Sequence, residues 1–300
     1  MNNVALFLLS SLIWGSTWIM ITFQLGSVSP LVSVVYRFSL ASAILFSFCW
    51  FKKKEFSFSP NEHFYIFVQG LFLFGINYWL TYVGITKISS ALAAILSTSI
   101  VYFNVVFARI FLRDKIKREV IMGATIGLIG IALIFIPQLD YSQSENEMIL
   151  GIIIVLAGSI FASLGNIVSA KTQRLKIPVM QANALGMGYA ALFLGVLAWL
   201  NNLEFSFEFS FKYIASLVYL SLFGSVIAFG AFLTLLGKVG PDKAGYISLV
   251  YPVIALVFST LFESYSWNLM GLIGVLFILI GNFIAMGKAN ELPIIKRINQ

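Results

Sequence analysis

Long runs of apolar residues without charged side chains recur along the whole chain and constrain its fold more than any other feature. A helix needs about 20 such residues to cross the hydrocarbon core of a membrane. Ten runs approach this length: Val4–Phe23, Pro30–Phe51, Phe64–Ile85, Ala91–Ala108, Val120–Ile136, Ile149–Ala170, Val179–Leu200, Tyr213–Gly237, Ala244–Phe262 and Trp267–Gly287. Because helices satisfy their own backbone hydrogen bonds in lipid, we expect an all-α membrane protein with ten transmembrane helices.

The composition agrees with a chain embedded in a bilayer. Apolar residues make up 60% of the 300 residues and charged residues 10%, against about 25% charged residues in soluble domains. This excludes an ordinary soluble enzyme, a disordered chain and a nucleic-acid-binding module. Cys49 and His63 are the single cysteine and histidine, so neither an intrachain disulfide nor a histidine-based metal cluster or triad can form. We expect no metal site and no cofactor, since phosphate-loop and dinucleotide motifs are also missing.

The positive charges are distributed unevenly over the loops. With the N-terminus placed in the cytoplasm, sixteen Lys and Arg fall on the cytoplasmic side, only Lys87 and Lys212 fall outside, and Arg37 lies within a span. Cytoplasmic loops of membrane proteins carry such an excess. We therefore predict a multi-pass protein of the inner (plasma) membrane with both termini in the cytoplasm. The net charge of +7 then requires no nucleic-acid partner.

The ten runs divide into two sets of five. We predict a first repeat over residues 1–140, a second over 148–287 and a cytoplasmic tail over 288–300, with a polar, acidic linker between the repeats. Equivalent residues recur at spacings of 148 to 151: Pro30 and Pro178, Lys87 and Lys238, Gly123 and Gly274, and Gly130 and Gly281. An odd number of spans per half makes the repeats inverted. Such repeats meet at a midplane cavity that opens alternately to each side, which predicts a carrier.

Several motifs in these runs resemble the drug/metabolite transporter superfamily in its ten-helix EamA-like branch, over about residues 4–287. They are Trp14-Gly15, Pro30 with Arg37, Gly84-Ile85-Thr86-Lys87, Ser89-Ser90-Ala91, Asp114, Gly237-Lys238-Val239-Gly240-Pro241, Ala244-Gly245-Tyr246, Tyr251-Pro252-Val253, Leu261-Phe262-Glu263 and the four repeated glycines. Val101 stands where the family has a proline in the fourth helix. The resemblance implies an integral inner-membrane carrier of small metabolites, exporting in many members, without specifying one cargo.

Arg37 lies about 10 Å inside its span at 1.5 Å per residue. A charge at that depth is costly unless it is hydrated or paired. No Asp or Glu lies deep in any span, and the residue 148 positions further on is Leu185. Two interpretations remain open: an anchor for a carboxylate or phosphate, which suits the guanidinium fork, or a structural arginine that snorkels or binds helix-end carbonyls. The resemblance favours the structural interpretation, because this arginine recurs in carriers of unlike cargo.

Polar residues form faces on several predicted helices. The candidate substrate-binding residues are Trp14, Arg37, Asn77, Tyr78, Tyr82, Ser97, Asn166, Tyr246 and Tyr251. Polar side chains in lipid should face protein or water, so each face lines a cavity or packs between helices. The stripe Gly158, Ala162, Gly165 and Ser169 is more typical of packing. Pro252 removes a backbone donor from its helix and is either a gate or a static kink.

Three functions remain to be compared. The main prediction is a carrier of an amino-acid-like or related metabolite working by alternating access, with a small-molecule substrate and the bilayer as partners. The alternative is a lipid or lipid-phosphate flippase on the same fold, with Arg37 meeting the head group. An intramembrane enzyme would need a catalytic constellation that the spans do not contain. Since no carboxylate or histidine lies in mid-span, we expect facilitated diffusion or exchange.

Overall fold

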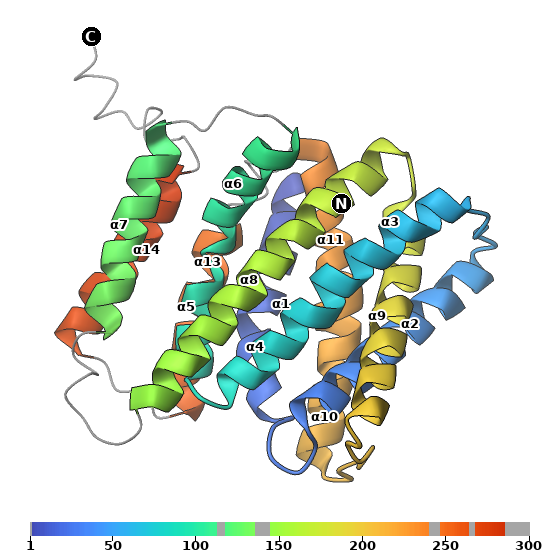
Figure 1. Ribbon diagram of the computed structural model, residues 1–300, viewed down its shortest axis with the longest axis horizontal. Coiled ribbons are helices and arrows are strands. Elements are labelled where there is room, and N and C mark those ends of the chain that lie inside the picture. Colours follow the sequence, from blue (N-terminus) through green and yellow to red (C-terminus); the bar gives the residue numbers. More distant parts are fainter. Residues whose placement is uncertain (1, 113–117, 136–144, 240–246, 264–267, 286–300) are drawn as a thin grey trace.

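The computed structural model describes residues 2–112, 118–135, 145–239, 247–263 and 268–285, which form a bundle of helices (Figure 1). The first half contains α1 (Asn3–Thr22), α2 (Pro30–Phe51), α3 (Pro60–Gly70), the π-helix η1 (Leu71–Ile76), α4 (Asn77–Ile85), α5 (Ser90–Ser97), α6 (Ile100–Leu112) and α7 (Arg118–Phe135). The second half contains α8 (Glu145–Arg174), α9 (Val179–Leu200), α10 (Phe211–Tyr219), the π-helix η3 (Leu220–Ile227), α11 (Ala228–Val239), α13 (Ile247–Phe262) and α14 (Leu269–Ala285).

These elements make ten spans in the described residues, as the sequence predicts. The third span is α3, η1 and α4 without interruption, and the eighth is α10, η3 and α11. Seven spans are long and apolar enough to cross a membrane by length and composition, and α7, α13 and α14 contribute shorter apolar helices. The prediction of an all-helical, ten-span membrane fold is confirmed.

Hydroxyl residues start many of the helices. The side chains of Ser29, Ser89 and Ser210 each accept a hydrogen bond from a backbone N–H in the first turn of α2, α5 and α10. Ser59 and Glu62 form a capping box at the start of α3. Such caps satisfy backbone donors that the helix itself leaves free. They set the start of each of these helices, which lies at the first residue of the predicted apolar run or up to four residues before it.

Two pairs of equivalent helices lie at opposite ends of the molecule. In Figure 1, α7 and α14 lie side by side at one end of the long axis, and α2 packs against α9 near the other end. A Cβ atom added at Gly130 would lie 2.6 Å from the Gly274 carbonyl oxygen, and one added at Gly281 would lie 2.5 Å from that of Gly123. The glycines thus meet crosswise, which is the self-complementary pattern of a two-fold axis. Because the later glycine of α7 meets the earlier glycine of α14, and the earlier one of α7 meets the later one of α14, the two helices run antiparallel and the repeats are inverted.

The halves also interlock through their first helices. The helix α1 packs on α11 and α13 of the second half, while α8 packs on α4 and α6 of the first half. Gly84 approaches Val155, and Gly165 approaches the backbone of Leu73. The glycines of the predicted packing stripe on α8 therefore allow close helix contact.

The fourth span departs from the sequence prediction of one continuous helix. It is divided into α5 and α6, and the break lies at Thr98 and Ser99. Around the break the backbone bonds are of the shorter i to i+3 kind, including Thr98 N–H to Ile95 and Val101 N–H to Thr98. The Thr98 hydroxyl also donates to the Ile95 carbonyl. Hydroxyl groups that bond back to the preceding turn compete with the α-helical pattern, so the helix breaks without a proline.

The turns that follow α2 and α9 are also equivalent in the two halves. Lys53 and Asn202, 149 residues apart, both have positive φ angles, of 50° and 54°. At each site the backbone N–H of the next residue bonds a carbonyl five positions back, which is the Schellman cap. The sequence Glu-Phe-Ser-Phe then follows at residues 55–58 and at residues 204–207. The same segment is thus used at both ends of the bundle.

Candidate functional site: a polar network around Arg37

Among the described residues each half has one π-helical segment, and the two segments occupy equivalent places. η1 contains Leu73-Phe74-Gly75 and η3 contains Leu222-Phe223-Gly224, 149 residues apart. Widened turns of this kind occur frequently at functional sites because they redirect carbonyl groups. Within η3, the Gly224 carbonyl accepts a hydrogen bond from Trp14 Nε1 at 3.2 Å. At the end of η1, the Asn77 side chain donates to the Leu73 carbonyl.

Arg37 lies beside η3 and is fully buried, with 1% of its surface exposed. Its Nε donates to the Ser225 hydroxyl at 3.1 Å, and one terminal nitrogen donates to the Tyr82 hydroxyl at 3.3 Å. The guanidinium carbon lies 4.4 Å from the centre of the Tyr78 ring. The Ser221 hydroxyl donates to the Arg37 backbone carbonyl. Arg37 therefore points into the protein and does not snorkel outward.

The network continues from Tyr82 to the turn between α1 and α2. The Tyr82 hydroxyl donates to Gln24 Oε1 at 2.8 Å. Gln24 is 1% exposed, and its amide nitrogen has no hydrogen-bond partner. An unpaired buried amide costs free energy. The polar chain Gln24, Tyr82, Arg37 and Ser225 thus retains one unused hydrogen-bond donor, the Gln24 amide, while the described residues around the guanidinium supply no carboxylate.

A second cluster lies next to this network. The Tyr251 hydroxyl is 2.8 Å from the Ser97 hydroxyl, and the Tyr251 ring stacks on Trp18 with centroids 6.2 Å apart. Trp14 packs against Phe229, which also contacts the Tyr78 ring. Four helices from both halves therefore bring aromatic rings together near the Arg37 network.

The structure brings together most of the predicted site residues, but not all of them. Arg37, Tyr78 and Tyr82 form the first cluster, with Trp14 linked through Gly224, and Ser97 and Tyr251 form the second. Asn77 is half-buried on the η1 side, and Asn166 is half-buried on α8. Tyr246 lies outside the described residues. Pro252 is buried within α13, which the structure assigns as one helix.

Several residues of the site were not among the sequence candidates. Gln24 was missed because it lies in a turn, and Ser221 and Ser225 because serines are common in the spans. The spacing of 148 pairs Arg37 with Leu185, whereas the π-helices and the Schellman caps align at 149 and pair it with Gly186. The repeated Leu-Phe-Gly motif could have revealed this alignment.

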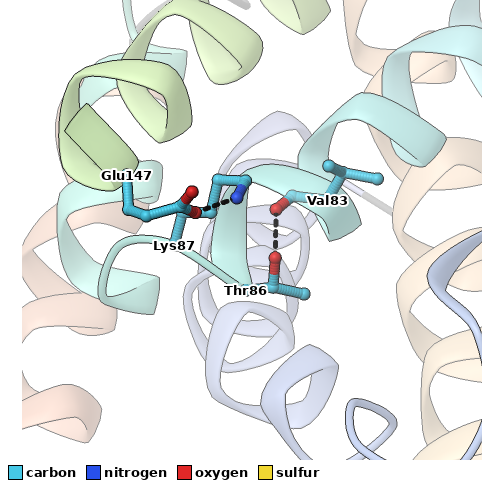
Figure 2. A network of polar contacts seen from close by, with 4 residues as sticks. All are labelled: Val83, Thr86, Lys87 and Glu147. Carbon is cyan, nitrogen blue, oxygen red and sulfur yellow. Dashed lines mark hydrogen bonds and ion pairs between the residues drawn. The ribbon is translucent and has the colours of Figure 1, made fainter. Parts of the chain in front are cut away.

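Two polar contacts join the halves at the end of the bundle that we predict to be external. Figure 2 shows Lys87, after α4, and Glu147, at the start of α8, pointing toward each other as an ion pair, beside the bond from the Thr86 hydroxyl to the Val83 carbonyl. Glu263, at the end of α13, accepts hydrogen bonds from the Ser90 hydroxyl at 2.6 Å and from the Ser259 hydroxyl. A carboxylate at the start of α5 is favoured by the helix dipole.

An internally duplicated, inverted bundle around a shared polar region is typical of membrane transporters. Two matches to a sequence profile described as the EamA-like transporter family cover residues 1–136 and 149–287. The chain therefore belongs to the EamA-like transporter family and carries two copies of its domain. It is a multi-pass membrane transporter and not an enzyme, as the sequence predicts.

Individual relatives align over nearly the whole chain. Protein PagO of Salmonella typhimurium LT2 is 26% identical over 97% of this chain and 95% of its own length. The uncharacterized inner membrane transporter YedA of Escherichia coli K12 is 28% identical, with 95% and 93% covered. The uncharacterized transporter YoaV of Bacillus subtilis 168 is 27% identical, with 91% and 92% covered. One crystal structure with 16% identity has the same fold, with a TM-score of 0.68 over 97% of this chain and 99% of that chain.

Proposed function

We propose that this protein is an inner-membrane carrier that exports a small, carboxylate-bearing metabolite of amino-acid-like chemistry by alternating access. The observation that carries the proposal is Arg37, a buried cation that contacts hydroxyl groups and aromatic rings. A guanidinium has five N–H donors, and two of them bond Ser225 and Tyr82. A substrate carboxylate would use the remaining donors and compensate the buried charge.

The surroundings of Arg37 suit a small organic anion. The Tyr78, Tyr251 and Trp18 rings supply apolar and edge contacts for an organic body, and the unpaired Gln24 amide supplies one further donor. Half-buried Asn77 and Asn166 add polar groups in mid-span. We assign Trp14, Arg37, Asn77, Tyr78, Tyr82, Ser97, Asn166, Tyr246 and Tyr251 to the substrate path and Pro252 to a gate or kink.

Orientation and location follow from charge and from the relatives. The excess of Lys and Arg supports cytoplasmic termini, and the name of YedA supports the inner membrane. In this orientation the Lys87–Glu147 and Glu263–Ser90 contacts close the external end. We also propose repeats at residues 1–140 and 148–287 followed by a cytoplasmic tail.

Transport is uncoupled or by exchange, which flux measurements with and without an imposed pH gradient would test.

A flippase is the alternative function on the same fold. A lipid head group would have to reach Arg37 from the bilayer. A groove on the outer surface of the bundle, between α2 and α9, has Ser39 in its wall, two residues from Arg37. Residues two apart lie about 200° apart around a helix, so Arg37 points away from that groove. This arrangement favours a soluble cargo.

Flux through the purified, reconstituted chain tests the proposal. The probes are labelled amino acids and their uncharged carboxamide analogues, compared between wild type, Arg37→Lys and Arg37→Gln, with Lys212→Gln as the control. Arg37→Gln should lower carboxylate flux about ten-fold or more, because a charged hydrogen bond is worth roughly 1.5–3 kcal/mol, while amide flux changes little. Equal loss of both fluxes in a folded variant would instead assign Arg37 to helix positioning.

A further inference from the structure

A groove follows the seam between α2 and α9 on the outer surface of the bundle. Its volume is about 620 Å³, and its walls include Ser39, Ala43 and Phe46 on α2 and Gly195 and Trp199 on α9. Leu192 and Val196, also in the wall, are 67% and 47% exposed. The groove is therefore open toward the space that the bilayer occupies, and it lies apart from the Arg37 network.

A second hollow extends the groove toward the predicted cytoplasmic end. Its volume is about 400 Å³, it shares Phe46 with the first groove, and it reaches Trp50, Lys54 and Phe56. The Phe46 and Phe56 rings lie 4.9 Å apart. The helical part of this path runs from Ser39 to Phe51, the last residue of α2, and measures about 18 Å at 1.5 Å per residue. One leaflet provides about 15 Å, half of the ~30 Å hydrocarbon core, so one acyl chain spans most of this path.

The two ends of the groove differ in charge although they are copies of one segment. The cytoplasmic copy reads Lys52-Lys53-Lys54, and the copy 149 residues later reads Asn201-Asn202-Leu203. Both copies have the same Schellman cap and are followed by Glu-Phe-Ser-Phe. Trp50 and Trp199 are also equivalent, and both are exposed. Of the two copies, the cytoplasmic one therefore carries the cations, and their charge exceeds that of the neighbouring Glu55.

We propose that the α2–α9 groove binds one anionic phospholipid, with its phosphate at Lys54 and one acyl chain along Phe46, Ala43 and Ser39. Clusters of lysine next to a membrane span attract anionic head groups, and tryptophan favours the interface between head groups and chains. The lipid would bridge the two repeats at the seam where they meet. A concave surface on each copy fits an inserted chain better than it fits a second copy of the same surface.

The test compares phosphatidylglycerol with phosphatidylcholine added to the purified full chain in detergent, measured by native mass spectrometry and thermal unfolding. Phosphatidylglycerol should bind and stabilise more strongly. Lys54→Leu, which copies Leu203, should weaken phosphatidylglycerol binding about five-fold, the equivalent of one lysine near an anionic head group. Leu203→Lys should create a second, weaker anionic site, and Lys212→Gln should change nothing.

A variant that fills the groove completes the test. A Cβ atom at Gly195 meets only Val35, at an ordinary 3.8 Å, so Gly195→Phe, which copies its equivalent Phe46, should fold. It should reduce retention of both lipids. Equal binding of the two lipids by wild type, or unchanged binding by Lys54→Leu, overturns the proposal. A dimer that Gly195→Phe dissociates would show that a second copy occupies the groove and would overturn it as well.

Discussion

The two π-helical segments occupy equivalent places in the two halves but face different partners. Beside η3, the Arg37 guanidinium lies between Ser225, Tyr82 and the Tyr78 ring. Beside η1, the equivalent of Arg37 is Gly186, and its backbone lies directly against Gly70 at the end of α3. The region beside η3 therefore surrounds a charged side chain with polar groups, whereas the region beside η1 is filled by contact between two backbones. Because the same fold accommodates both arrangements, the fold alone does not require the polar groups around Arg37, and this supports a role for them in binding.

The largest loss of stability should come from a substitution at Gly70, where the backbones of α3 and α9 touch. A Cβ atom at Gly70 would overlap the Gly186 carbonyl and lie 2.7 Å from the Gly186 Cα, whereas one at Gly75 would have the Ala190 Cβ as its nearest neighbour, at an ordinary 3.5 Å. Gly70→Ala should therefore lower the free energy of unfolding by about 3 kcal/mol, and Gly75→Ala by less than about 1 kcal/mol. Thermal unfolding in detergent measures both. Similar values for the two variants would contradict the backbone contact.

The next largest loss of stability is expected for the serines of η3 that bond Arg37. Ser225→Ala removes the acceptor of a buried charged donor and should cost about 2 kcal/mol, whereas Ser221→Ala removes a neutral bond to the Arg37 carbonyl and should cost about 1 kcal/mol. Chemical or thermal unfolding of the two variants gives the ranking. A larger loss for Ser221→Ala would mean that η3 holds the α2 backbone and not the guanidinium.

The contact between Glu263 and Ser90 joins the two halves and should be weaker. Glu263→Gln should destabilise the protein by about 1 kcal/mol, since the amide keeps one acceptor but loses the charge. A double-mutant cycle with Ser90→Ala should show coupling, and Glu204→Gln, at an exposed loop residue, serves as the control. Strictly additive losses would show that the carboxylate does not hold α5.

The smallest effect should appear in the loop before α10. Hydrogen bonds from the Ser210 and Ser27 hydroxyls lower the pKa of Glu208 below its ordinary value. The unfolded state therefore binds a proton more readily, so the stabilisation is complete above the ordinary glutamate pKa of about 4.3 and is lost as the pH falls through the lowered pKa. Ser27→Ala should lower the melting temperature slightly at pH 7 and leave it unchanged at strongly acidic pH. A difference that persists in acid would exclude this ionic cause.

The spans could be predicted from the sequence because a charge buried in lipid is costly, so membrane-spanning segments are long runs without charged residues. It also predicted Arg37, Tyr78, Tyr82, Ser97 and Tyr251 as candidates, and the structure places them close together. It did not predict the break at Thr98 and Ser99, because hydroxyl groups break a helix less recognisably than proline does. The partners Gln24 and Ser225 come from elements far away in the chain, and their pairing depends on tertiary packing that local patterns do not encode. Whether these residues bind a substrate stays a prediction.

The break in the fourth span has a consequence for the opposite conformation of the transporter. Its equivalent in the second half, α13, runs unbroken past Pro252, whose counterpart in the first half is Val101, just beyond the break. If the halves exchange their shapes during alternating access, the fourth span straightens while α13 bends next to Pro252. Pro252 would then lower the free-energy cost of bending α13, whereas no proline at Val101 lowers the cost of bending the fourth span. This difference would shift the equilibrium between the two conformations.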